Sequence, residues 1–201
     1  MLTASDISPA TFAISLAAKR RNAVAAILFG GLLVGLFLEV FSFKPAGFLA
    51  GILLGLLYAN AYEYFFHRFL LHPPGRTLAY YHGLHHSTWG TPDEPLYVNF
   101  AKNPLVVVLL FALNALPIFA LEYVLRAGLA PGMMVGFVVY FVAYEEIHWR
   151  IHFGGWLPSW LESARRHHLQ HHAAADGRFN IFLPLFDWLF GPSRARKTSR
   201  P

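Results

Sequence analysis

The chain has 201 residues, of which 56% are hydrophobic and only 13% are charged, whereas typical soluble domains have about 25% charged residues. With a mean hydropathy of +0.43, this composition excludes an ordinary soluble globule. A formal net charge of +5 could suit nucleic acid, but the apolar composition favours lipid, so we expect no nucleic-acid partner. Because the sequence contains no cysteine, disulfides, thiolate-ligated zinc, iron–sulfur clusters and thiol nucleophiles are excluded.

Four intervals of the chain contain no Asp, Glu, Lys or Arg: 22–38, 45–62, 103–121 and 127–144. A bilayer core of ~30 Å requires ~20 helical residues, with ~17 near the lower limit. We therefore predict transmembrane helices at about 22–43, 45–66, 103–125 and 127–149. The short connections within each pair predict two hairpins. The expected fold is an all-α integral membrane protein, with four transmembrane helices in two hairpins and a cytoplasmic, histidine-rich helical cap.

The distribution of basic residues predicts the orientation. Fourteen of the 16 Lys and Arg lie before the first span, between the second and third, or after the fourth; only Lys44 and Arg126 lie on the other side. The positive-inside rule then places both termini and the middle segment in the cytoplasm.

The two terminal segments are interpreted separately from the membrane domain, which we place at 23–192. Residues 1–22 have no basic n-region and no evident cleavage site, so we interpret them as a cytoplasmic or interfacial segment. Ser8–Arg21 is either an interfacial helix or a polar leader. The basic tail, 193–201, could dock an electron donor, but attraction to anionic lipid explains it equally simply and is favoured.

The eleven histidines fall into four clusters, two after the second span and two after the fourth. They are His67 and His72 in HRFLLH; His82, His85 and His86 in HGLHH; His148 and His152 in HWRIH; and His167, His168, His171 and His172 in HHLQHH. A lone histidine is more often a hydrogen-bonded residue at a helix end. Four clusters at ligand spacing favour metal binding instead.

The spacing within two of the clusters predicts how they bind metal. His148 and His152 are four residues apart, so they share one helix face, as two ligands of one ion require. His67 and His72 are five apart, about 140° on an ideal helix. One of them is therefore expected where the helix unwinds before Pro73, and the two could serve different metals.

Each of the two H-x-x-H-H clusters is expected to serve two neighbouring metals. We predict that the first two histidines of the pattern, His82 with His85 and His168 with His171, face one way. The adjacent His86 or His172 then points about 100° aside.

Ligand type alone does not identify the metal, since neutral imidazole binds zinc, copper, iron and nickel. Ten histidines exceed the four ligands of a closed zinc site and suit two five- or six-coordinate ions.

Four carboxylates lie near the histidines in sequence. Glu63, four residues before His67, and Glu145, three before His148, are predicted to accept an imidazole N–H and so fix its tautomer. For Glu146 and Asp187, this role and an ordinary surface charge are equally favoured. Glu122 and Arg126, four residues apart, are expected to form a helix ion pair at the far interface.

The four clusters, in this order, resemble the fatty acid hydroxylase/sterol desaturase superfamily of membrane-bound, non-haem di-iron oxidoreductases. The resemblance covers roughly 60–192. It is most specific from Tyr62-Glu63 through HRFLLH, from Tyr144-Glu145 through HWRIHFG, and in ARRHHLQHH and FDWLFG. These stretches are similar to fatty acid 2-hydroxylases. The resemblance implies ten metal ligands, with His167 left over: His67, His72, His82, His85, His86, His148, His152, His168, His171 and His172.

The resemblance also implies an activity, namely O₂-dependent hydroxylation or desaturation of a lipid C–H bond, in a fatty acyl chain or a sterol. The cofactors would be two metal ions, iron in the family, with zinc as a possible substitute. Glu63 and Glu145 would belong to the catalytic site. No haem or flavin motif is visible, so the electrons are expected from a separate donor protein.

Three alternatives stay open from the sequence. Carotenoid hydroxylases are comparably short and carry similar boxes. A zinc-dependent membrane hydrolase would need fewer ligands and a carboxylate general base at the metal. A metal transporter is disfavoured because the charge-free intervals contain no histidine.

The orientation yields a first prediction. A reporter fused after Pro201 should lie in the cytoplasm, because the basic residues gather on that side. A reporter found on the opposite side would contradict either the orientation or the number of spans.

Overall fold

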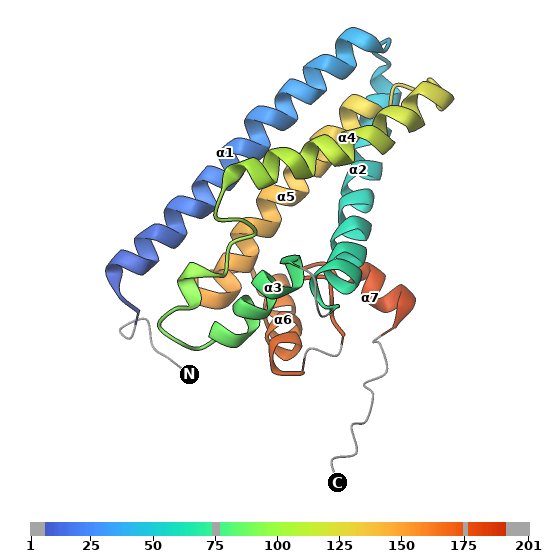
Figure 1. Cartoon of the computed structure of the whole chain (residues 1–201). Coiled ribbons are helices and arrows are strands. Elements are labelled where there is room, and N and C mark those ends of the chain that lie inside the picture. Colours follow the sequence, from blue (N-terminus) through green and yellow to red (C-terminus); the bar gives the residue numbers. More distant parts are fainter. Residues whose placement is uncertain (1–6, 74–76, 175–176, 192–201) are drawn as a thin grey trace.

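The computed structural model describes residues 7–73, 77–174 and 177–191. Four long helices, α1 (Pro9–Val40), α2 (Pro45–Phe66), α4 (Pro104–Leu125) and α5 (Ala130–Phe153), form a bundle (Figure 1). All four are long and apolar enough to cross a membrane, α2 together with the turn that extends it to Leu71. No strand occurs among the described residues. The all-α fold with four candidate spans in two hairpins is confirmed.

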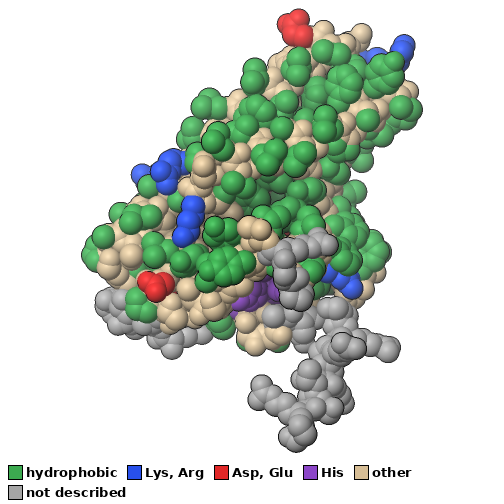
Figure 2. All heavy atoms as spheres, viewed as in Figure 1, with side chains coloured by type: hydrophobic (Ala, Val, Ile, Leu, Met, Phe, Trp, Pro, Cys, Tyr) green, Lys and Arg blue, Asp and Glu red, His purple; other side chains and the backbone are tan. Residues whose placement is uncertain are grey.

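Shorter elements gather at one end of the bundle (Figure 1). They are a π-helical turn (His67–Leu71), α3 (Thr77–Thr88), α6 (Glu162–Ala174), α7 (Leu185–Phe190) and the 3₁₀ turns Glu94–Leu96 and Ser159–Leu161. Figure 2 shows hydrophobic side chains covering the long helices on the visible face, with histidine side chains at the end that carries the short elements. The predicted tail, 193–201, lies outside the described residues.

The first helix is longer than the sequence predicts, because Ser8–Arg21 continues directly into the span instead of forming a separate helix or leader. Ser8 caps α1, its side chain accepting from the backbone N–H of Thr11, and Pro9 occupies the first turn. At 1.5 Å per residue, 32 residues extend about 48 Å, well beyond a ~30 Å bilayer core. The N-terminal part of α1 therefore extends beyond the span and lies beside the short elements (Figure 1).

The turn between α4 and α5 depends on Glu122. The sequence predicts an ion pair of Glu122 with Arg126, but the structure gives Glu122 other partners. Its buried carboxylate accepts from the backbone N–H groups of Gly128, Leu129 and Ala130 at 2.7, 2.5 and 3.1 Å. These are N–H groups that the start of a helix leaves without partners, and a negative charge there is favourable. Glu122 is thus a cap for α5.

Glycines allow α2 and α5 to approach at backbone distance. The glycines on the two facing surfaces are Gly51 and Gly55 on α2 and Gly132 and Gly136 on α5. A Cβ atom at any of them would lie 2.0–2.4 Å from a carbonyl oxygen of the other helix. Small residues drive close helix packing where lipid supplies no hydrophobic force between helices. This contact fixes α5 against α2 and so fixes the two histidine-bearing helix ends relative to each other.

This contact yields a second prediction. Gly132→Ala places a Cβ 2.0 Å from the carbonyl oxygen of Phe48, so the helices must separate, at a cost of about 1–3 kcal/mol. The matched control is Gly31→Ala on α1, where a Cβ meets no atom within 4 Å. Thermal unfolding in detergent should show a lower midpoint for Gly132→Ala only. Equal midpoints for the two variants would refute the close contact.

Candidate metal centre

The ten predicted ligands gather into two clusters of five. The first cluster is His67, His72, His82, His86 and His171, and the second is His85, His148, His152, His168 and His172. In each, one ring nitrogen of every member lies within 4.8 Å of those of the other four. Every histidine motif of the sequence except HWRIH contributes to the first cluster in space. Every motif except HRFLLH contributes to the second.

The π-helical turn unites His67 and His72 in one cluster, which corrects the prediction that they could serve different metals. His72 does lie just beyond the end of the helical turn, before Pro73, as predicted, but this does not separate it from His67. Instead the helix widens over His67–Leu71, and a π turn bonds residues five apart, bringing them onto one face. The spacing of five is therefore the one that this turn requires for two ligands of the same ion.

The H-x-x-H-H clusters do serve both sites, as predicted, but the pairing differs from the prediction. His82 pairs with His86 in the first cluster, while His85 joins the second. In α6, His168 pairs with His172, and His171 joins the first cluster. Residues four apart are separated by about 40° on a helix, against about 60° for residues three apart. The closer pair shares a metal site.

The nitrogen separations fit a metal with more than four ligands. In the first cluster Nε2 of His82 lies 3.0, 3.2 and 3.0 Å from Nε2 of His67, His72 and His86. In the second, Nε2 of His168 lies 3.0–3.1 Å from the Nε2 atoms of His148, His152 and His172. At a metal–nitrogen distance of ~2.1 Å, ligands at right angles are about 3.0 Å apart and tetrahedral ones about 3.4 Å.

For seven of the cluster histidines the surroundings favour the neutral imidazole, which is the form that binds metal. Burial lowers the pKa of His72, His86 and His171 to about 4. Burial and repulsion from neighbouring imidazoles also hold the pKa of His82, His85, His168 and His172 well below the usual value. A second proton on any of these seven imidazoles is therefore unfavourable even before a metal competes for the nitrogen.

Backbone carbonyls orient two members of the first cluster. Nδ1 of His67 lies 2.6 Å from the carbonyl oxygen of Phe179, and Nδ1 of His171 lies 2.5 Å from that of Gly177. Since a carbonyl oxygen only accepts, both Nδ1 atoms must carry the proton. The Nε2 atoms then present lone pairs to His82 and His72, at 3.0 and 3.2 Å. Two lone pairs directed at neighbouring imidazoles in this way suit a metal ion between the rings.

The second cluster contains a carboxylate that the sequence analysis did not identify. Nδ1 of His152 lies 2.6 Å from Oε1 of the buried Glu94, whose Oε2 accepts from the backbone N–H of Gly90 at 2.8 Å. Both ring nitrogens of the buried His85 lack a hydrogen-bond partner among the described residues. A buried polar atom without a partner is costly, and a metal at this cluster would satisfy it.

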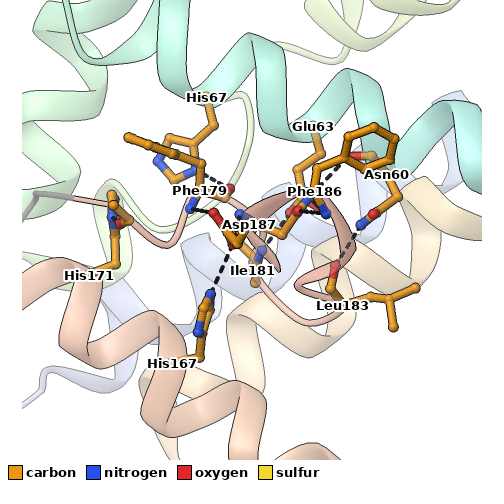
Figure 3. Close-up of polar contacts among 12 residues, drawn as sticks. Asn60, Glu63, His67, His167, His171, Phe179, Ile181, Leu183, Phe186 and Asp187 are labelled. Atoms are coloured by element: carbon orange, nitrogen blue, oxygen red, sulfur yellow. Dashed lines mark hydrogen bonds and ion pairs between the residues drawn. The ribbon is translucent and has the colours of Figure 1, made fainter. Parts of the chain in front are cut away.

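Asp187 and Glu63 hold the segment Gly177–Ile181, which we call the carbonyl loop (Figure 3). Asp187 accepts from the backbone N–H groups of Phe179 and Asn180 at 2.8 and 2.9 Å. Glu63 accepts from the backbone N–H of Ile181 and the Asn180 amide, both at 2.9 Å.

The prediction that Glu63 accepts an imidazole N–H is therefore wrong. Besides the carbonyl loop, its carboxylate accepts from the hydroxyl of Tyr140 at 2.5 Å. The side chain extends from α2 toward the carbonyl loop and Tyr140 of α5, and away from the imidazole of His67 (Figure 3).

The corresponding prediction for Glu145 is also wrong. Its Oε1 accepts from the amide of Asn22 at 2.7 Å and from the backbone N–H of Phe100 at 3.2 Å, so it ties α1 and the segment before α4 to α5. Glu146 forms ion pairs with Lys19 and Arg150 at 2.5 and 2.6 Å. Both carboxylates stabilise the bundle beside α1.

His167 lies outside both clusters, consistent with its exclusion from the predicted ligands. Its Nε2 is 3.0 Å from Oδ2 of Asp187, and Figure 3 shows it on the far side of Asp187 from His67. The sequence left two roles open for Asp187, an acceptor for a metal-ligating imidazole or an ordinary surface charge, and the structure shows neither. Asp187 is buried and contacts the carbonyl loop and His167, but no member of a cluster.

An apolar pocket opens beside both clusters. Its walls come from α2, α4 and α5, with an empty volume of about 590 Å³ that includes the part open to the surroundings. The non-histidine lining residues are mostly hydrophobic or aromatic: Ala59, Tyr62, Glu63, Phe66, Leu71, Phe100, Leu110, Phe137, Tyr140, Phe141, Tyr144 and Ile181. His67 and His82 of the first cluster and His85 and His168 of the second also line it. One apolar chain in the pocket would therefore meet both clusters.

The comparisons with known proteins agree with this geometry. The sequence model for fatty acid hydroxylase matches residues 52–192, which is more than half of the chain. Among curated proteins, none matches significantly. Among solved structures, the chain is similar to full-length Scs7p, in which only the hydroxylase domain is visible, with a TM-score of 0.62 and 21% identity. The similarity covers 83% of this chain and 61% of that one, so this chain spans less than two thirds of that length, and at this identity the likeness shows the fold.

The cluster geometry yields a third prediction. Replacing His82 or His148 by Ala should each remove about one of two bound metal ions per chain, because each residue belongs to one cluster only. His167→Ala is the matched control and should leave both ions in place. Metal analysis of the purified protein provides the measurement, and a full complement of metal in either cluster variant would contradict its assignment.

Proposed function

Because the chain belongs to the fatty acid hydroxylase family, we propose that it is a membrane-bound oxidoreductase that uses O₂ to hydroxylate a C–H bond of a lipid. The observation that supports this most is the apolar pocket, whose wall contains histidines of both clusters. An alkyl chain is the substrate class that such a lining accepts. The substrate is thus a fatty acyl chain, with a sterol as the bulkier alternative.

We further propose that the two clusters hold two iron ions. Five imidazoles at each site, with separations near 3.0 Å, suit an ion that binds more than four ligands. No side chain can oxidise an alkyl C–H bond, so the metal pair supplies that redox chemistry when bound. The ten imidazoles would hold the ions, and hydrogen bonds from Nδ1 of His67 and His171 to backbone carbonyls leave the Nε2 lone pairs of these two free to bind.

The chain's own contribution is to position the substrate and exclude water. Phe66, Phe137 and Phe141 narrow the pocket between α2 and α5 and leave little for water to bond to. Two of the polar groups in this wall, Glu63 and Tyr140, are hydrogen-bonded to each other. Their polarity is therefore satisfied internally, and the alkyl chain meets an essentially apolar surface that guides it toward the histidines.

Two parts of this proposal concern the surroundings of the protein. The positive-inside distribution of basic residues supports placement of the histidine-bearing end in the cytoplasm. The electrons come from a separate donor protein, since the sequence contains no haem or flavin motif.

The proposal yields a fourth prediction. Lipids from cells that express the protein under isotopically labelled O₂ should contain a product with one labelled oxygen atom, absent from cells expressing His148→Ala. Mass spectrometry of saponified lipids identifies the substrate. A new double bond without label would indicate desaturation, and labelled carotenoids would indicate carotenoid hydroxylation. One zinc ion per chain with release of a hydrolysis product would overturn the proposal in favour of a zinc hydrolase.

A companion variant separates the pocket from the metal sites. Ala59 lines the pocket from α2 and contacts neither cluster through a hydrogen bond. Ala59→Phe fills the space that the alkyl chain needs, so it should keep both metals but lose most of the labelled product. Full product formation in a variant that retains its metal would exclude this pocket as the substrate site.

A further inference from the structure

The two clusters differ in how their imidazoles are oriented. In the first, the carbonyl loop supplies two neutral acceptors, the carbonyl oxygens of Gly177 and Phe179, to His171 and His67. In the second, the carboxylate of Glu94 contacts His152 directly. The carbonyl loop follows α6, whereas Glu94 lies in the segment between α3 and α4. The two orienting devices thus belong to separate parts of the chain.

The carbonyl loop is held by two carboxylates that contact no member of a cluster. From one side, Asp187 of α7 binds the N–H groups of Phe179 and Asn180 with one oxygen each. From the other side, Glu63 of α2 binds Asn180 and Ile181. Figure 3 shows the loop running between these two side chains, with His67 and His171 beyond it. Asp187 is buried and Glu63 is half-buried within this network.

The same residues connect α7 to the loop. The side-chain oxygen of Asn180 accepts from the backbone N–H of Phe186, at 3.2 Å, and its amide also donates to the carbonyl oxygen of Asn60 at 3.0 Å. Four charge-assisted contacts and two neutral ones therefore fix the peptide groups around Phe179. Since charge-assisted hydrogen bonds are about twice as strong as neutral ones, the carboxylates dominate the placement of the loop.

From this geometry we propose that Glu63 and Asp187 are positioning residues for the first cluster alone, acting through the carbonyl loop, and that Glu94 is the positioning residue for the second. The inference rests on the proposed function only in requiring two bound metal ions. Its consequence is that the metal affinity of each site can be lowered separately by substitutions that replace none of the ten histidines.

An amide in place of either carboxylate is the sharpest perturbation. In Asp187→Asn, the NH₂ group faces one of two backbone N–H donors, so one contact is replaced by repulsion between donors. The loop then shifts, and His67 and His171 lose the acceptors that set their tautomers. Loss of such orienting partners typically costs ~10–100-fold in metal affinity.

The experiment measures metal content after exposure of the purified, metal-loaded protein to a graded chelator. Asp187→Asn and Glu63→Gln should each release one of two ions at a chelator concentration 10-fold or more below that needed by the unsubstituted chain. Glu94→Gln should likewise release one ion. Glu146→Gln, whose side chain contacts Lys19 and Arg150 at the same end of the bundle, should behave like the unsubstituted chain.

Double variants identify which ion is lost. Asp187→Asn combined with His82→Ala should retain one ion, since both changes affect the first cluster. Combined with His148→Ala it should retain none after the chelator step. For Glu94→Gln the outcomes should be reversed. The ion that remains in each single variant also reports that the bundle is folded.

The results separate this inference from the proposed function. Fewer than two ions in the unsubstituted chain would contradict the proposed two-metal function itself. With two ions present, the inference is overturned if Asp187→Asn and Glu63→Gln release their first ion only at the chelator concentration that the unsubstituted chain requires. It is also overturned if they lose both ions together or lose the ion of the second cluster. His167→Ala, which removes only the outer contact to Asp187, should keep both ions.

Discussion

The structure depends on the convergence of ten imidazoles, all of them buried or half-buried, in two tight clusters. Nitrogen lone pairs that face each other at 3.0–3.2 Å repel, and the low dielectric of a buried site strengthens that repulsion. A cation at the centre of each cluster converts it into attraction. The rest of the fold keeps these imidazoles together and correctly rotated, through the glycine contact of α2 with α5, the capped turn at Glu122 and the carbonyl loop.

Helix geometry distributes the ligands between the two sites. On α3 and α6 the pair four residues apart belongs to one cluster and the remaining histidine to the other, so each short helix bridges both clusters. The π turn after α2 acts differently, because it places two histidines five residues apart in the same cluster. The rings of His86 and His172, one from each cluster, are stacked with centroids 4.4 Å apart. The two clusters are thus neighbours carried by the same short helices, α3 and α6. This arrangement suits chemistry on a substrate held in the pocket beside both of them.

Much of this architecture could be predicted from the sequence, because its signals are local. Charge-free intervals locate the four long helices, and the resemblance of the four histidine motifs to a known family selects the ten histidines that the fold brings together. The errors occur where distant segments decide the outcome. Glu145 is on the expected face of α5, but α1 continues far enough to place Asn22 against it. Glu94 is in an irregular segment with no periodicity, so only the fold reveals that it meets His152. The carbonyl groups of Gly177 and Phe179 carry no side-chain signal at all.

The central claim is that two metal ions are each held by five specific histidines. Anomalous X-ray diffraction at the iron absorption edge, from crystals of the iron-loaded protein, tests it most directly. The account predicts two anomalous peaks per chain, one within about 2.1 Å of a ring nitrogen from His67, His72, His82, His86 and His171, and one within that distance of His85, His148, His152, His168 and His172. A single peak, or two peaks whose ligands divide the histidines differently, would contradict it.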